Sequence, residues 1–245
     1  MEALILAFFA IGYLVLGGAD IGVGMLLPYL GRTSGERREV IAAIAPFFLG
    51  NEVWLVATAG VLTGLFPTGE GELLSGNYAV VVGLLAAWVV RDMGLWLRGR
   101  LSGATWRLVW DGAIVAGSWG LAISLGLLLG DALVGLGGPV ALLPGLLVAL
   151  LLAVHGLAFA SLRLRGELRE RASVLAGRSA GWRAYALTSA ALAALVVIAG
   201  GAVRLEATGP AFLAPVIAGI IPFLVASQAW VWWTFRHRVT GPSYL

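Results

Sequence analysis

Long apolar runs with almost no charge inside them dominate this sequence. A helix that crosses the hydrocarbon core of a bilayer needs about 20 consecutive, mostly apolar residues. Seven runs meet this requirement, Gly and Pro fall between them, and the alternating pattern of a barrel strand is absent. We therefore predict about seven transmembrane helices, at residues 4–30, 40–66, 76–98, 107–129, 139–163, 184–204 and 211–235.

Composition indicates that lipid is the solvent of these runs. Of 245 residues, 60% are hydrophobic and 12% are charged, whereas a soluble domain carries about 25% charged residues. Glycine occurs 35 times, and it is commoner in transmembrane helices than in soluble ones. The expected fold class is an all-α integral membrane protein, a single polytopic domain over residues 1–245.

Several classes of chemistry are excluded by the residues that the chain lacks. The absence of Cys excludes disulfides, thiolate zinc sites and iron–sulfur ligation. The net charge of +3 comes from Arg in short loops between apolar runs, which is a topological pattern and not a nucleic-acid surface. We find no phosphate-binding loop, nucleophile triad or metal cluster, and expect no metal in this chain.

The placement of Arg predicts the orientation in the membrane. Arg residues occur in the 31–40 loop, around residues 98–107, in 163–183 and in the tail after 235, but not in 67–75 or 130–138. Arg204, beside Glu206, is the one exception. By the positive-inside rule the N-terminus is outside and the C-terminus cytoplasmic. The first run has no basic residues before it, so we expect it to be a retained helix and not a secretory signal.

Two acids inside apolar runs are the first candidates for function. A mid-helix acid costs about 2.5–3.5 kcal/mol to insert, so Asp20 and Glu52 should face protein and not lipid. Counted along uninterrupted helices, both lie about 15–17 Å from the same membrane face. Such a pair could relay or share a proton. The alternative is a buried charge network, neutralised by an Arg or by Asn51 and Thr58.

Small residues accompany the first acid. Gly17 and Gly24 lie three and four positions from Asp20 and therefore share its helix face. We expect close helix packing there, because small residues let another backbone approach.

The single His within an apolar run limits what this chain can bind. A haem with two axial His needs both at membrane depth, and His237 lies past the last run. We therefore expect His155 to be a packed, hydrogen-bonded residue and no cofactor to be bound by this chain. In the basic loop, Glu167 precedes Arg171 by four residues, the favourable order for a helical ion pair.

Several motifs resemble subunit II of cytochrome bd-type quinol oxidases. The strongest blocks are Gly18-Ala19-Asp20-Ile21-Gly22-Val23-Gly24-Met25-Leu26, Gly31-Arg32 with Glu36-Arg37-Arg38, and Gly50-Asn51-Glu52-Val53-Trp54-Leu55 running to Phe66-Pro67. Further similarity lies in Arg91 with Gly94, Trp106-Arg107 through Trp110-Asp111-Gly112, Gly117-Ser118, and Gly166-Glu167-Leu168 with Arg171-Ala172.

The resemblance implies a terminal oxidase of the bacterial cytoplasmic (inner) membrane that takes electrons from quinol and reduces dioxygen to water. In that family a partner, subunit I, holds haem b and haem d and oxidises the quinol, and subunit II binds no haem. It also implies a first four-helix bundle, residues 1–130. The remaining three helices, 131–245, would form an incomplete second bundle. Small accessory membrane subunits, lipid or quinone are further expected partners, and nucleic acid is not.

Residue roles follow from the same likeness. Trp54 would lie near an oxygen entry route, and Arg91, Asp92 and Asp111 near the haem-bearing partner. Asp20, Glu52 and Asn51 would form the proton relay or buried charge network. Leu49 stands where family members often carry the Asp of a proposed proton path, so either Glu52 takes that role or protons travel through subunit I alone.

Two other hypotheses remain open from the residues. The chain could be a proton- or cation-coupled transporter that uses Asp20 and Glu52 at the midplane, although no matched pair of interrupted helices is seen. It could also be a purely structural partner without a proton role, which Leu49 favours.

Overall fold

The computed structural model describes residues 1–134, 142–176, 181–203 and 205–241, and within them the fold is all helical, with no strand. Seven helices are long and apolar enough to cross a membrane, which confirms the predicted fold class. They are α1 (Glu2–Met25), α4 (Phe48–Leu65), α6 (Tyr78–Leu97), α7 (Ala104–Val134), α8 (Leu142–Arg163), α10 (Trp182–Ala202) and α11 (Leu213–Thr234). The chain is therefore a multi-pass membrane protein. Its orientation in the membrane stays a prediction. Arg204, the exception to the Arg pattern, lies outside the described residues.

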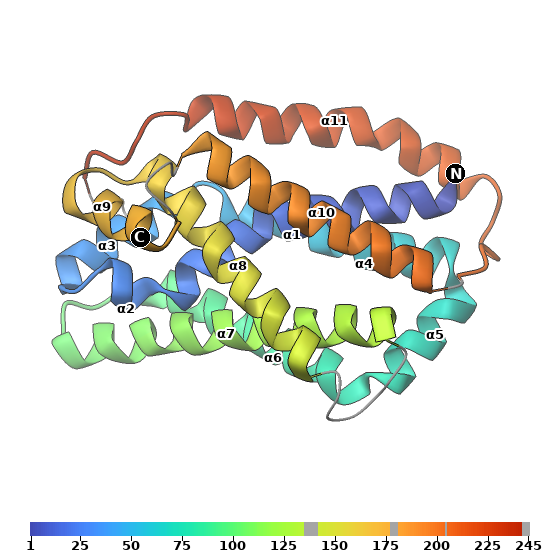
Figure 1. Cartoon of the computed structure of the whole chain (residues 1–245), viewed down its shortest axis with the longest axis horizontal. Helices are drawn as coiled ribbons and strands as arrows, with labels where there is room; N and C mark the ends of the chain where they lie inside the picture. The colour runs from blue at the N-terminus through green and yellow to red at the C-terminus, as the bar shows by residue number, and fades with distance from the viewer. Residues whose placement is uncertain (135–141, 177–180, 204, 242–245) are drawn as a thin grey trace.

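The first helix is the centre of the bundle. Helix α1 packs against α4, α7, α8 and α10, while α6 lies against α7 and α11 runs along the outside of the group (Figure 1). Contacts of α1 therefore reach helices on both sides of residue 130. The predicted division into a bundle over 1–130 and three helices over 131–245 stays a prediction.

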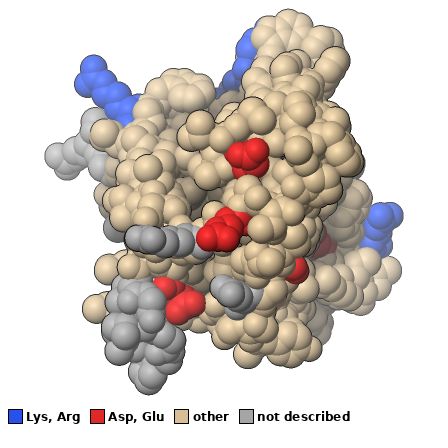
Figure 2. All heavy atoms as spheres, turned by 90° about the vertical axis from the view of Figure 1, so that its right-hand side faces the viewer, with Lys and Arg blue, Asp and Glu red and all other residues tan. Residues whose placement is uncertain are grey.

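Four shorter helices cap the two ends of the bundle. Helices α2 (Leu27–Leu30), α3 (Ser34–Ile44) and α9 (Gly166–Ala176) lie at one end, and α5 (Pro67–Gly76) lies at the other, near the N-terminus (Figure 1). At this second end acidic side chains stand near the middle of the face and basic ones only at its margins (Figure 2). Helices α5 and α9 occupy segments for which we predicted connections, whereas α2 lies within the predicted run 4–30 and α3 extends into the predicted run 40–66.

Prolines explain where the observed helices differ from the apolar runs. The run 4–30 is interrupted after Met25, and Pro28 lies in the first turn of α2. The run 40–66 divides into α3 and α4, with Pro46 in the gap. Proline lacks a backbone N–H and its ring clashes with the preceding turn, so an uninterrupted helix is disfavoured at both places.

Arg171 connects the two short helices α3 and α9 at the Arg-rich end of the bundle. Glu36 closes a capping box with Thr33 at the start of α3. Arg171 of α9 pairs with Glu36 Oε1 at 2.9 Å and with Glu167 Oε2 at 3.0 Å. The ion pair predicted between Glu167 and Arg171 is confirmed, and the contact with Glu36 is a link that the sequence did not reveal.

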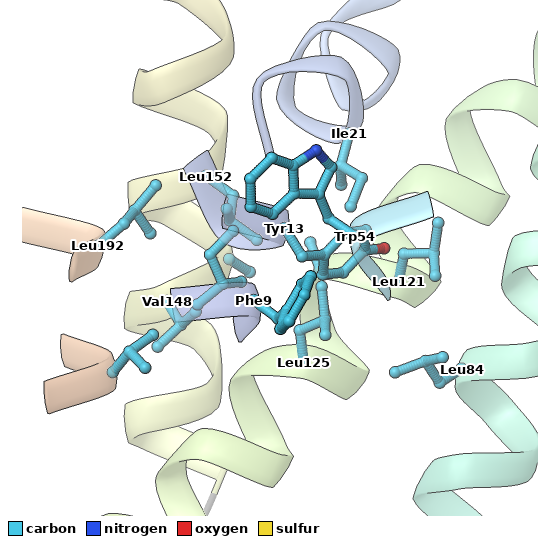
Figure 3. Packing of buried hydrophobic residues seen from close by; sticks show 14 of the residues in the cluster. Phe9, Tyr13, Ile21, Trp54, Leu84, Leu121, Leu125, Val148, Leu152 and Leu192 are labelled. Atoms are coloured by element: carbon cyan, nitrogen blue, oxygen red, sulfur yellow. The ribbon is translucent and has the colours of Figure 1, made fainter. Parts of the chain in front are cut away.

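An apolar core fills the space around α1. Phe9 and Tyr13 of α1 point toward Trp54 of α4, with leucines of α7, α8 and α10 around them (Figure 3). A second apolar cluster lies toward α3 and α9, and includes Phe47 and Phe159. On the outer side, α10 and α11 expose large apolar residues such as Ile198 and Phe223, as expected of helices that face lipid.

Candidate functional site

A chain of buried polar side chains links three helices near Asp20. Asn51 of α4 donates from Nδ2 to Asp20 Oδ2 at 2.6 Å and also to the carbonyl oxygen of Leu16. Gln228 of α11 donates to Asn51 Oδ1 at 2.9 Å, and Trp54 Nε1 donates to Gln228 Oε1 at 3.3 Å. Asp20 is 1% exposed, so the hydrogen bond from Asn51 replaces part of the water that its carboxylate has lost.

A second group surrounds the guanidinium of Arg91. This side chain, 3% exposed, lies 3.3 Å from Glu52 Oε1 and 3.0 Å from Asp92 Oδ1. Its Cζ atom also lies 6.0 Å from the centre of the Phe48 ring. Two carboxyl groups therefore face one guanidinium, and each accepts a charge-assisted hydrogen bond from it.

One small cavity joins the two groups. Asp20, Glu52 and Arg91 line it together with Tyr13 and Trp88, and its volume is about 10 Å³, which is close to the space that one water molecule occupies. Among the described residues, Asp20 Oδ1 and Arg91 Nε are buried without a hydrogen-bond partner. A water at this place would meet carboxylate acceptors from one side and a guanidinium donor from the other.

The two acids thus share a cavity, but they lie closer to the ends of their helices than the sequence suggested. Asp20 precedes Met25, the end of α1, by five residues, and Glu52 follows Phe48, the start of α4, by four. At a rise of 1.5 Å per residue, these separations correspond to about 6–8 Å and not to 15–17 Å. The difference arises because Pro28 and Pro46 interrupt the runs along which the depth was counted.

Asp111 belongs to a different ionic cluster. Its Oδ2 lies 3.1 Å from Arg37 Nη1, and its Oδ1 accepts a hydrogen bond from Arg98 Nε. Arg98 also donates to the carbonyl oxygen of Ser34 at 3.1 Å. Asp111 is buried, and its two ion pairs join α7 to α3 and to Arg98, the residue that follows α6.

The glycines of α1 differ in what they pack against. At Gly24 the neighbour is the Ser118 side chain of α7, whereas at Gly17 it is the Tyr13 ring of α1 itself. The closest approach to another backbone is at Gly22, where α8 passes with Gly156 against it. The sequence pointed to small residues on this helix but not to Gly22, because its partner lies more than a hundred residues away.

The intramembrane histidine is fully engaged inside the chain. One ring nitrogen of His155 lies 2.7 Å from Thr188 Oγ1 and the other lies 2.8 Å from the carbonyl oxygen of Val15. The prediction of a packed, hydrogen-bonded histidine is confirmed. Both nitrogens are occupied and His237 is exposed outside the helices, so these residues do not suit axial ligation of a haem.

Gln228 is the member of the site that sequence reasoning missed. The sequence does contain a signal for it. Gln228 is a polar amide within the last apolar run, and such residues form hydrogen bonds between helices. Thr58, considered as a partner of the acids, donates instead to the carbonyl oxygen of Trp54.

Comparison with known proteins adds to this geometry. The family model described as cytochrome bd terminal oxidase subunit II matches residues 1–237. The chain is 33% identical over 195 residues to the cytochrome bd ubiquinol oxidase subunit 2 of Bacillus subtilis, with 73% of this chain and 57% of the relative covered. It is 32% identical over 187 residues to the cytochrome bd-I ubiquinol oxidase subunit 2 of Escherichia coli K12, with 69% and 49% covered. A probable cytochrome oxidase subunit 2 of Haemophilus influenzae is 34% identical over 181 residues, with 66% and 48% covered. The chain spans about half the length of the curated relatives it matches.

Proposed function

Because the chain belongs to the cytochrome bd terminal oxidase subunit II family, we propose that it is the non-haem-binding subunit of a bd-type quinol oxidase. The complex takes electrons from quinol and reduces dioxygen to water in the bacterial cytoplasmic membrane. The family match, which spans residues 1–237, carries this proposal. It gives no support to the transporter alternative.

Haem b and haem d belong, in this proposal, to the partner subunit I. The bonding of His155 supports that assignment, since both of its ring nitrogens are engaged by Thr188 and Val15. The haems supply the electron transfer and oxygen chemistry. The residues of this chain hold the partner in place, exclude water and position acids.

We propose that the partner subunit I binds to the surface around Asp92. A groove of about 430 Å³ runs along α6 beside Asp92, with Trp88, Met93 and Trp96 among its lining residues. The combination of exposed apolar side chains and one carboxylate suits a protein neighbour better than lipid. Arg91 lies behind this face and acts through Asp92, while Asp111 supports the same helices from its ionic cluster. The other exposed apolar faces remain for lipid, quinone or small accessory subunits.

Trp54 is proposed to form a wall of the oxygen entry route. Its ring lies 5.3 Å from that of Phe8 and 6.0 Å from that of Phe9, between centroids. Dioxygen is apolar, so an aromatic lining favours its passage over that of water. The hydrogen bond to Gln228 fixes the orientation of the indole.

Glu52 is the residue that we propose to pass protons. Its side chain is 15% exposed, whereas Asp20 is buried, so Glu52 is the acid that a proton can reach from outside this chain. A water in the small cavity would carry the proton from Glu52 toward Asp20, whose Oδ1 has no hydrogen-bond partner among the described residues. Leu49 is 51% exposed and does not line the cavity, so the relay does not need a carboxyl group at that position.

Glu52→Gln tests this function in the purified oxidase. We expect quinol-dependent oxygen uptake to fall by about tenfold or more, because removal of a positioned proton-transfer group commonly costs about 10²–10⁴. The haem spectrum and the yield of complex should not change. Glu206→Gln is the matched control, because Glu206 is exposed and outside the helices.

The outcomes separate the two parts of the proposal. Normal turnover in Glu52→Gln would remove the relay and leave a structural subunit. A wild-type preparation without haem absorbance and without quinol-dependent oxygen uptake would remove the oxidase assignment itself.

A further inference from the structure

A cavity at one end of the bundle is lined by arginine. It has a volume of about 660 Å³ and lies at the end of the bundle that carries α3 and the connection from α6 to α7 (Figure 1). None of its described lining residues is acidic. They are Ser34, Gly35, Arg38, Arg98, Gly99, Arg100, Leu101, Ser102 and Arg107.

Two helices also begin at this cavity. Ser34 and Gly35 are the first residues of α3, and Ser102 and Arg107 flank the start of α7 at Ala104. The N-terminus of a helix carries a partial positive charge and backbone N–H groups without intrahelical partners, both of which attract anions. The start of α3 is already capped by Thr33 and Glu36, so the arginines and the start of α7 are what act on this space.

The acids next to the cavity do not cancel its positive charge. Glu36, which follows Gly35, is paired with Arg171 of α9. Asp111 is shared between Arg98 and Arg37, so this cluster has one more basic than acidic group. Arg98 is held in place by that contact and by the Ser34 carbonyl. Arg107 Nε is buried and has no hydrogen-bond partner among the described residues.

An apolar surface adjoins the basic cavity. Leu101 lines the cavity and is 56% exposed, and Leu108 and Val109 are exposed on α7, directly after Arg107. Since α7 is long and apolar enough to cross a membrane, these side chains begin an apolar surface that continues from the cavity along the helix. A ligand that matches both the basic cavity and the adjoining apolar surface has an anionic phosphate head and an apolar tail.

We propose that this cavity is a binding site for the headgroup of an anionic phospholipid. The phosphate lies between Arg100 and Arg107 at the start of α7, and the acyl chains run along the exposed apolar side of α7. Inorganic phosphate or a soluble phosphate ester shares the head chemistry but does not use the apolar surface.

The test uses the full chain with whatever subunits copurify, stripped of lipid in mild detergent. Native mass spectrometry then counts bound dioleoylphosphatidylglycerol and dioleoylphosphatidylcholine, which differ in net charge but have the same acyl chains. We expect selective retention of phosphatidylglycerol. In Arg100→Gln/Arg107→Gln it should drop about tenfold or more, since each arginine close to an anionic lipid contributes several-fold.

Matched variants keep the result interpretable. Arg165→Gln/Arg169→Gln removes two exposed arginines of the predicted cytoplasmic loop outside the cavity, and should change retention less than about twofold. Arg100→Gln alone alters an exposed residue, so a partial loss in this variant supports the site even if the double variant folds poorly.

Three results would overturn the site. The first is equal retention of the two lipids, and the second is an unchanged phosphatidylglycerol count in Arg100→Gln and in the double variant. The third is binding of glycerol 3-phosphate as tight as that of phosphatidylglycerol, which would assign the cavity to a soluble phosphate ester. Oxygen uptake is not part of the readout, so the test is independent of the proposed oxidase function.

Discussion

At the residue scale, the hydrogen bonds of Asn51 explain why the residue between α1 and α11 is an amide and not a third acid. Its Nδ2 donates to Asp20 while its Oδ1 accepts from Gln228, and only an amide offers both in fixed positions. An acid there would place a carboxylate 2.6 Å from another. The exchange of donor and acceptor satisfies both polar atoms of the Asn51 amide without further charge.

Glu36 gives a pH dependence with a defined direction. The guanidinium of Arg171 and the backbone N–H groups of Thr33 and Arg32 bind its carboxylate and lower its pKa to about 2, whereas a free Glu has a pKa of about 4.3. The stabilisation is complete above the free value and disappears as the pH falls through the folded value. We expect the thermal unfolding midpoint to decrease between about pH 4.3 and pH 2.

A variant identifies the residue responsible. Glu36→Gln should have a lower midpoint at neutral pH and a smaller decrease on acidification, whereas Glu170→Gln, on the exposed side of α9, should behave as wild type. Parallel pH profiles for wild type and Glu36→Gln would show that this contact does not couple α3 to α9.

Residues close in sequence were easier to predict than those that meet through the fold. Glu167 and Arg171 are one helical turn apart, so spacing alone indicated their ion pair. Asp20 and Glu52 were found because a charge is rare in an apolar run. Gln228 and Arg98 bond to residues of other helices, and the sequence does not tell which helices are neighbours.

At the element scale, the crossing of α1 and α8 depends on two glycines. A Cβ atom at Gly156 would overlap the backbone of Gly22, and one at Gly22 would overlap the backbone of Leu152. The length of the two apolar runs predicted that both helices exist. Their exact crossing point did not, because small residues occur throughout both runs and only the packed structure selects one pair.

The free energies of unfolding of Gly156→Ala and Gly200→Ala test how closely α1 and α8 approach each other. Both replace a helical glycine, so both gain the same preference of alanine for helix. Only Gly156 has a neighbouring backbone in the way; the space around Gly200 is open. We expect Gly156→Ala to lower the free energy of unfolding by about 1–3 kcal/mol relative to Gly200→Ala. Equal stabilities in detergent unfolding would contradict the close approach.

At the scale of the whole molecule, the seven-helix count followed from hydropathy, while the helix arrangement needed the structure. The central place of α1, with α4, α7, α8 and α10 around it, cannot be read from run lengths. The prolines that shorten α1 and α4 were visible in the sequence. Hydropathy does not show their effect, because apolar residues continue on both sides of Pro28 and Pro46.

The orientation can be tested cleanly because the chain has no Cys. Gly71 of α5 and Glu170 of α9 are exposed at the two ends of the bundle, so each can carry a single introduced Cys. A membrane-impermeant maleimide should label Gly71→Cys in spheroplasts, and Glu170→Cys only after the membrane is opened. The reverse pattern would contradict the orientation predicted from Arg placement.

The assignment of the redox chemistry to a neighbouring polypeptide can be measured directly. The tagged chain is purified from its native membrane, the reduced-minus-oxidised absorbance spectrum is recorded, and the subunits are then separated under conditions that retain haem. We expect bands of haem b and haem d in the complex, which follow the partner and leave this chain colourless. Haem that stays with this chain alone, or a purified chain that never carries haem-containing partners, would contradict its place as subunit II of a quinol oxidase.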